Sequence, residues 1–376
     1  MSDKPGATAE PPGPQQVDLN QIEAIVTSEF QIEQALLEGG VPTYYLRQPQ
    51  ETKQPFLRLL GKLEPMSLIA FLRRKEGRMV LKIAPKPPTR PSNVWVNWVL
   101  LFATVGTTFA TGYILSGSFM DPFIGGATFT IAIMAVLGAH EMGHKLTANK
   151  DGIDATPPYF IPGPPPVFGI FGIGTFGAVI MQKSLPRNRD SLFDVGASGP
   201  VVGFLIAAIA VAVGLPLCTY AWISPTEGAL PTPLLFSLIG MFLPPFGAIP
   251  QRPVGDFMLA INLHPVAFAG WVGLFVTMLN ILPAAMLDGG HVSRSLVGDR
   301  TRTVLAALSV LFLVWFSLPM ALFVVFMSMY KHPGPLDDVS GLSTGRKLFV
   351  IVLVAVFLLA SPMQSFVSSL LGFLGL

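Results

Sequence analysis

The stretch FIGGATFTIAIMAVLGAHEMGHKL, residues 123–146, joins a long apolar run to a polar cluster at its end. From Phe123 to Ala139 it contains no charged side chain. A helix of about 20 apolar residues spans the hydrocarbon core of a bilayer. The stretch then reaches His140, Glu141 and His144, which are costly beside hydrocarbon unless they are paired or bind a ligand. The sequence therefore predicts a membrane-spanning helix with a functional site near one end.

The spacing of this polar cluster indicates a metal site. His140 and His144 are four residues apart, so both imidazoles lie on one face of a helix and can reach one ion. Glu141 lies beside them, where a carboxylate can take a proton from water at the metal. The alternative is a helix end whose polar groups reach the membrane interface. With only five histidines in the chain, we favour the metal site.

Composition divides the chain into a soluble part and a membrane part. Of its 376 residues, 51% are hydrophobic and 12% are charged, whereas an ordinary soluble domain has about 25% charged residues. Residues 1–90 hold 22 of the 46 Asp, Glu, Lys and Arg side chains. The net charge of +2 gives no reason to expect a nucleic acid partner, and the single cysteine, Cys218, excludes an internal disulfide.

The N-terminal part is expected to fold separately. Residues 1–17 are polar and proline-rich, which is typical of a disordered tail rather than a signal peptide. We expect a cytosolic α+β domain over residues 18–88 and a membrane domain over 89–376. Within the α+β domain we expect a helix through about Ser28, a strand at 41–46, a second helix at 68–74 and, after a turn at Gly77, a strand at 79–83.

The membrane part is expected to be polytopic and α-helical, with about six spans in the lipid bilayer. The candidate spans are 94–116, 123–146, 192–215, 264–286, 303–330 and 347–374. Two further apolar stretches, 157–182 and 231–250, are crowded with glycine and proline. They make poor continuous helices, so we expect re-entrant or surface-lying segments there.

Basic residues predict the orientation. Seven Lys and Arg between Arg73 and Arg90 precede the first span, which places the N-terminal domain in the cytosol of a cell-membrane protein. Alternation of the spans then puts eight further basic residues in the cytosol and four outside. The four expected outside are Arg252, Lys331, Arg346 and Lys347.

A catalytic zinc needs a third protein ligand and an open position. No Glu or His follows His144 closely, and Glu227 is expected on the outer side. His140 lies 18 residues after Pro122, about 27 Å along a helix, and so near the cytosolic end of its span. Asp288 follows the 264–286 span at the same end and is the favoured ligand; the alternative is a helix N-cap.

The other histidines are weaker candidates. His291 is close enough to Asp288 to be the second choice as ligand or a group behind the ligands. His264 is expected at the opposite end of its span, and His332 in an outer loop. Asn280 lies about two helical turns before Asp288 and either holds a substrate carbonyl or makes an interhelical hydrogen bond.

A glycine-rich segment offers a place for substrate. Gly172, Gly174 and Gly177 match GxGxxG, but no βαβ unit surrounds them, so we expect no nucleotide cofactor. We predict a strand or hairpin over 175–182 whose edge holds an unwound substrate segment by strand addition, or else a packing loop. The candidate substrate-binding residues are Gly174, Thr175, Gly177, Ala178 and Val179. Small residues near Gly199 are expected to serve close helix packing, and Asp194 to be structural.

Together, His140–His144 and Asn280–Gly290 resemble the site-2 protease family of intramembrane zinc metalloproteases, over about residues 90–376. That family carries HExxH on one transmembrane helix and N-x-x-P-x-x-x-L-D-G on another, and both motifs are complete here. The resemblance implies one Zn²⁺ held by His140, His144 and Asp288, with Glu141 as general base and acid. It also implies cleavage of single-pass transmembrane proteins, as in regulated intramembrane proteolysis.

Two other classes of function remain open at this point. A transporter or channel with a structural metal site also uses broken helices and intramembrane acids. Transport does not need a full ligand set with an adjacent glutamate, which favours the protease. An inactive relative is disfavoured because no catalytic position is missing.

Overall fold

The computed structural model describes residues 19–88, 92–117, 120–167, 172–224, 230–284, 286–328 and 334–363. Its contacts divide the chain into two units, one of residues up to Pro88 with Leu336–Ser340, the other of the remainder. The expected disordered tail and the residues Glu227, Lys331 and His332 lie outside the described residues, as does the last apolar segment beyond Met363.

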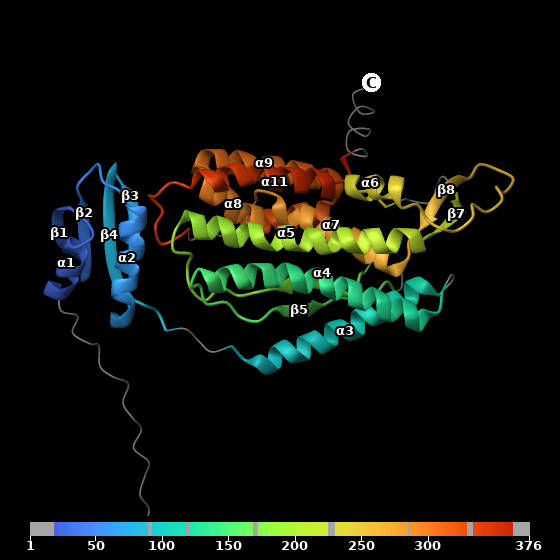
Figure 1. Ribbon diagram of the computed structural model, residues 1–376, viewed down its shortest axis with the longest axis horizontal. Coiled ribbons are helices and arrows are strands. Elements are labelled where there is room, and N and C mark those ends of the chain that lie inside the picture. Colours follow the sequence, from blue (N-terminus) through green and yellow to red (C-terminus); the bar gives the residue numbers. More distant parts are fainter. Residues whose placement is uncertain are drawn as a thin grey trace, which may run out of the picture. The chain divides into compact units, whose positions relative to one another are not determined.

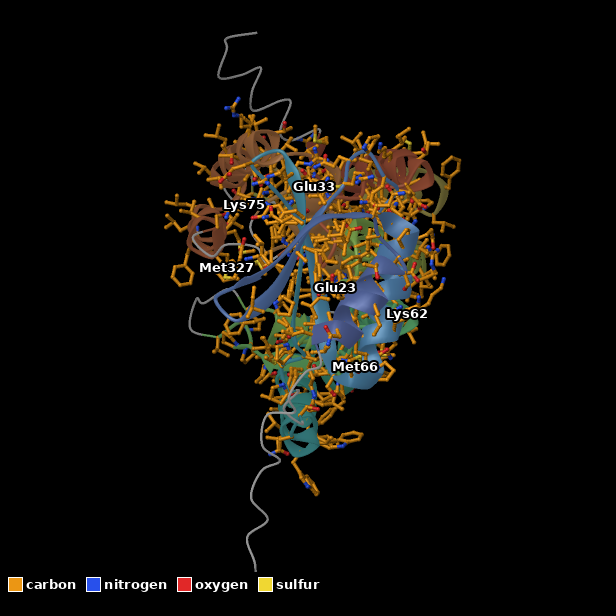
Figure 2. The ribbon with its side chains drawn as sticks, turned by 90° about the vertical axis from the view of Figure 1, so that its left-hand side faces the viewer. Glu23, Glu33, Lys62, Met66, Lys75 and Met327 are labelled. Carbon is orange, nitrogen blue, oxygen red and sulfur yellow. The ribbon has the colours of Figure 1, made fainter. Side chains whose placement is uncertain are left out.

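The N-terminal unit is an antiparallel sheet with two helices (Figure 1). Figure 2 shows Glu23 and Lys62, one on each helix, and both side chains are exposed. Phe56, Leu59 and Leu63 of the second helix are fully buried. The strand order is β1-β2-β4-β3, with β1 Ile32–Glu38, β2 Val41–Leu46, β3 Leu68–Lys75 and β4 Arg78–Pro85, and the helices are α1 Leu19–Thr27 and α2 Lys53–Leu63.

The expected second helix at 68–74 is wrong, because these residues form strand β3. Its side chains alternate between buried and half-buried from Leu68 to Arg73, the period of a strand rather than a helix. The first helix and the strands at 41–46 and 79–83 are confirmed. The helix that sequence reasoning missed is α2, where Pro55 and Gly61 weaken the helical signal although its apolar residues have helical spacing.

The second unit is mostly helical. Three of its helices are long and apolar enough to cross a membrane: α3 Val94–Ser116, α4 Pro122–Lys150 and α5 Arg189–Gly214, extended by a turn to Leu217. The segment 231–250 contains only the nine-residue helix α6 Leu234–Phe242, so it is not a continuous span, as expected. The other helices are α7 Pro265–Ile281, α8 Asp288–Leu296, α9 Asp299–Phe316, α10 Leu318–Ser328 and α11 Thr344–Ala360.

Two small hairpins complete the unit. β5 Tyr159–Pro162 pairs with β6 Thr175–Val179, which confirms the predicted hairpin in the glycine-rich segment. β7 Thr219–Ile223 pairs with β8 Met258–Asn262. Of the segment that joins β5 to β6, residues 168–171 lie outside the described residues.

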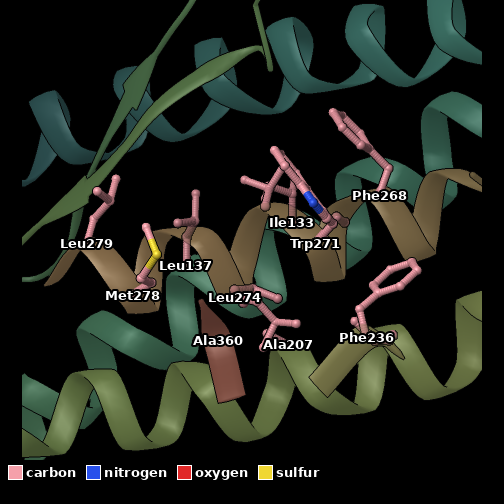
Figure 3. Packing of buried hydrophobic residues seen from close by; sticks show 14 of the residues in the cluster. Ile133, Leu137, Ala207, Phe236, Phe268, Trp271, Leu274, Met278, Leu279 and Ala360 are labelled. Carbon is pink, nitrogen blue, oxygen red and sulfur yellow. The ribbon is translucent and has the colours of Figure 1, made fainter. Parts of the chain in front are cut away.

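Helices α4, α5 and α7 share one core (Figure 3). Ile133 of α4, Ala207 of α5 and Leu274 of α7 are fully buried in it. A Cβ at Gly270 of α7 would lie 2.7 Å from the Val211 backbone nitrogen of α5, so only glycine fits there. Close backbone approach of this kind stabilises helix pairs in a membrane, where lipid is as apolar as the core.

The predicted span at 303–330 is wrong. Ser317 is extended and separates α9 from α10. A Cβ at Gly196 of α5 would lie 2.9 Å from Cβ of His291, so α8 lies against the first half of α5. The chain returns to this end at Arg346, which pairs with Asp190 at the start of α5. A chain that leaves and returns at one end has not crossed once, so the expected outer position of Arg346 and Lys347 is wrong too.

Candidate metal centre

Three side chains from two distant segments meet at one point. Nε2 of His140 and Nε2 of His144 are 3.1 Å apart, and each lies 3.2 Å from Oδ2 of Asp288. Ligands about 2.0–2.1 Å from a tetrahedral zinc are themselves about 3.3–3.4 Å apart. Two imidazoles and one carboxylate are also a donor set of catalytic zinc sites, which keep a fourth position open. These residues fit a zinc ion, and all three lie at helix positions that burial keeps from bulk water.

A backbone contact fixes the orientation of one imidazole. Nδ1 of His144 lies 2.7 Å from the carbonyl oxygen of Val195 on α5, and it donates to that oxygen when it carries the ring proton. That tautomer leaves Nε2 as the electron-pair donor that faces His140 and Asp288. The helix pair α4–α5 therefore orients a ligand as well as burying it.

Glycines on α5 make the room for these rings. A Cβ at Gly199 would lie 2.1 Å from Nε2 of His144, and a Cβ at Gly203 would lie 2.9 Å from Nδ1 of His140. A Cβ at Gly196 would meet the Asp288 carbonyl oxygen at 3.0 Å. The expected close packing of this segment is confirmed. What the sequence did not reveal is that the space serves the three side chains of the metal centre.

Glu141 joins the metal centre to the β5–β6 hairpin. Its side chain is buried, and its carboxylate accepts a hydrogen bond from the backbone of Ile180, the residue after β6. Helix α3 holds both roots of this hairpin. Asn97 donates to the carbonyl oxygens of Pro157 and Pro158 at 3.1 and 3.0 Å, and the Thr107 hydroxyl donates to Gly174 at 2.6 Å. Sequence reasoning missed Asn97 and Thr107, whose only signal is a polar side chain in an apolar helix.

The residues expected to bind substrate differ in exposure. The Thr175 hydroxyl donates to the Ile161 carbonyl at 2.9 Å and accepts from the Gly177 backbone, so it serves the hairpin itself. Gly174 and Gly177 have φ of +77° and +105°, which favour glycine. Ala178 is half-buried, whereas Val179 at the end of β6 is 47% exposed.

The remaining candidates have distinct positions. Nδ2 of Asn280 lies 3.3 Å from Nε2 of His140, so Asn280 reaches the metal centre. His291 is one turn beyond Asp288 and is outside the ligand cluster. His264 caps the opposite end of α7, as expected, and Asp194 forms an ion pair with Arg346 rather than joining the cluster.

Comparisons with known proteins agree with this centre. The family model of peptidase family M50 matches residues 128–322. The probable zinc metalloprotease EGY1, chloroplastic, of Arabidopsis thaliana is 30% identical over 64% of this chain and 44% of its own length. EGY1 of Oryza sativa is 29% identical over 77% and 48%, and Arabidopsis EGY2 is 33% identical over 46% and 29%. The chain thus spans less than half the length of these relatives. No solved structure matches it.

Proposed function

The chain belongs to peptidase family M50, and from this premise we propose that it is an intramembrane zinc endopeptidase. Its substrates are single-pass proteins, cut in or near their transmembrane segments. The observation that carries the proposal is the triangle of His140, His144 and Asp288 with Glu141 beside it at one end of membrane-length helices. We assign the three as zinc ligands and Glu141 as the proton carrier.

Each group has a part in hydrolysis. Bound zinc supplies a Lewis acid that polarises the peptide carbonyl and makes water more acidic. Glu141 accepts the proton from the attacking water and delivers it to the leaving amine. The Asn280 amide lies next to the ligands, where it can donate to the substrate carbonyl oxygen as negative charge develops.

The β5–β6 hairpin supports a way to hold the substrate. A transmembrane helix hides its peptide bonds, so it must unwind before it is cut. An extended segment can add to the outer edge of β6, which ends at the backbone group bound to Glu141. Strand addition there brings a peptide bond near the metal centre.

We propose a multi-pass protein in the lipid bilayer with its N-terminal domain in the cytosol. Besides α3, α4 and α5, we assign crossings to α7 and α11, which have 17 residues each, about 25 Å of helix. Such helices are slightly short and are accommodated by local thinning of the bilayer. The pair α9–α10 then enters and returns, which gives five crossings rather than six. Arg346 and Lys347 join the cytosolic side, which strengthens the positive-inside bias.

The transporter or channel alternative is not favoured. The buried Glu141 sits beside a complete three-ligand set, and transport needs neither the open ligand position nor the glutamate.

Reconstituted proteolysis tests the proposal. The purified protein is placed in liposomes with tagged single-pass substrates, and zinc content is measured in the same samples. We expect fragments from the parent protein, and none from Glu141→Gln although its zinc is unchanged, because only the proton carrier is lost. Cleavage by Glu141→Gln within a few-fold of the parent rate would refute the role of Glu141. A zinc-loaded parent that cuts no substrate would refute the protease assignment.

A further inference from the structure

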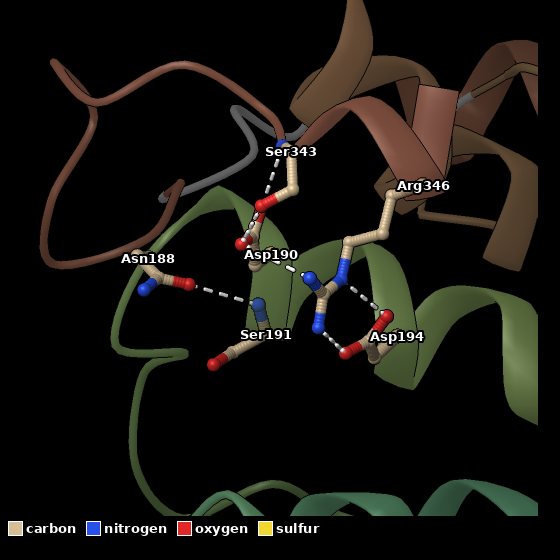
Figure 4. Close-up of polar contacts among 6 residues, drawn as sticks. All are labelled: Asn188, Asp190, Ser191, Asp194, Ser343 and Arg346. Atoms are coloured by element: carbon tan, nitrogen blue, oxygen red, sulfur yellow. Dashed lines mark hydrogen bonds and ion pairs between the residues drawn. The ribbon is translucent and has the colours of Figure 1, made fainter. Parts of the chain in front are cut away.

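A polar cluster ties the start of α11 to the start of α5 (Figure 4). Nε of Arg346 donates to Oδ1 of Asp194 at 2.7 Å, and its Nη2 pairs with the other oxygen of the same carboxylate. Nη1 of Arg346 donates to Oδ2 of Asp190 at 3.1 Å. The Ser343 backbone N–H donates to Oδ1 of Asp190 at 2.9 Å. We call Asp190, Asp194, Ser343 and Arg346 the α5–α11 clasp.

The geometry of the clasp is specific to arginine. Asp190 and Asp194 are one turn apart on α5, so the planar guanidinium bridges both carboxylates. Its contact with Asp194 uses two parallel hydrogen bonds, which a lysine cannot reproduce. Asp190 also binds the N-terminal backbone of α11, where the helix dipole favours a negative charge.

The clasp encloses an apolar cluster that includes α8. Phe193 and Ala197 of α5 pack with Val292 of α8, and with Leu342 and Leu353 from the α11 side. Val292 is four residues after Asp288, so it lies on the same face of α8 as the ligand. Helix α8 is thus held between α5 and α11 one turn beyond the metal centre.

Helix α8 needs this support because its own start is weakly fixed. It has nine residues, and no side chain caps its N-terminus. A helix this short is marginal without tertiary packing. Asp288 is its first residue, so the position of the carboxylate depends on what holds α8 against α5.

We propose that Arg346 is a positioning residue of the metal centre: by clasping α11 to α5 it fixes α8 and so holds Asp288 over His140 and His144. This inference rests on the zinc site proposed above. Arg346 touches no ligand, and its effect passes through the packing of Val292.

Cobalt binding tests the proposal without reference to proteolysis. Metal-free protein in detergent is titrated with Co²⁺, and the visible absorption reports the geometry of the ligands. Arg346→Ala is compared with Lys347→Ala, which removes the same charge from the next residue of α11, where the side chain is exposed. We expect Arg346→Ala to shift the cobalt spectrum and weaken binding about 10–100-fold, the usual loss when a group behind the ligands is removed. Lys347→Ala should behave as the parent protein.

Two further variants keep the test decisive if Arg346→Ala does not fold. Arg346→Lys and Asp194→Asn each keep part of the clasp, and both should show a smaller change in the same direction. A folded variant of Arg346 or Asp194 with the parent's cobalt spectrum and affinity would overturn the proposal. Failure of the zinc site itself is recognised separately, because the parent protein would then give the same cobalt spectrum as His144→Ala.

Discussion

At the scale of single residues, the imidazole of His144 has its space because α5 carries a glycine opposite it. The van der Waals contact of a methyl group with a ring nitrogen needs well over 3 Å, and a Cβ at residue 199 would have 2.1 Å. The methyl group must displace either the ring or the helix. Either movement separates His144 from His140 and Asp288, which now lie within 3.2 Å of it.

We therefore predict that Gly199→Ala lowers zinc occupancy and removes most proteolysis. Helix content should persist, because alanine is a better helix former than glycine. Gly106→Ala on α3 is the matched control, since a Cβ there has nothing within 4 Å. Zinc measured by mass spectrometry in both purified variants checks this. Full occupancy in Gly199→Ala would show that the site yields to a methyl group, and would remove this account of the glycines.

At the scale of elements, the hairpin is set against Glu141 by α3 on one side and by pairing of β5 with β6 within it. Neighbouring residues of a strand point their N–H groups in opposite directions. One of Ala178 and Val179 therefore offers its N–H to β5, and the other to an added strand.

Proline at each position separates these two roles, because proline has no N–H. We predict that Ala178→Pro or Val179→Pro, whichever removes the outward N–H, slows cleavage at least about tenfold. Zinc content should not change in that variant. Ala178→Val, which retains its N–H, is the control. If both proline variants turn over substrate at the parent rate, β6 serves packing only.

The same elements show how far the sequence alone reaches. HExxH fixes two side chains on one helix face by spacing, so His140 and His144 could be placed before the structure was known. Asp288 followed from depth, because its segment ends at the same side of the membrane. The clasp, Asn97 and the contact of Val195 with His144 join residues far apart in the chain, and no local period announces such contacts. The error at 68–74 arose where six residues suit either a helix or a strand.

At the scale of the whole molecule, one loop belongs to both units. Leu336–Ser340 contacts the N-terminal sheet: the Leu72 N–H donates to the Leu336 carbonyl at 2.9 Å, and the Asp338 N–H donates to Leu72 at 3.1 Å. Only three residues further on, Ser343 binds Asp190 of the membrane unit. So short a link cannot cross a bilayer, since three residues extend about 10 Å at most. Both ends therefore lie on one side of the membrane.

This arrangement predicts which exposed positions share a side. Single cysteines replace Glu33 in the sheet, Lys347 in α11 and Arg252 before β8, in a protein whose buried Cys218 is changed to alanine. A maleimide that cannot cross membranes should label Glu33→Cys and Lys347→Cys from the same side, and Arg252→Cys from the other. Labelling of Lys347→Cys together with Arg252→Cys would restore a single crossing at 303–330 and contradict the paired α9–α10.

The most direct test of the zinc centre compares the metal content of purified Asp288→Ala and His291→Ala. Both side chains lie on α8, one turn apart, and only Asp288 lies within the ligand cluster. We predict one zinc per chain in the parent protein, a sharp loss of zinc and of activity in Asp288→Ala, and retained zinc in His291→Ala. Activity of His291→Ala should fall about 10–100-fold at most. Zinc retained by Asp288→Ala and lost from His291→Ala would contradict the account.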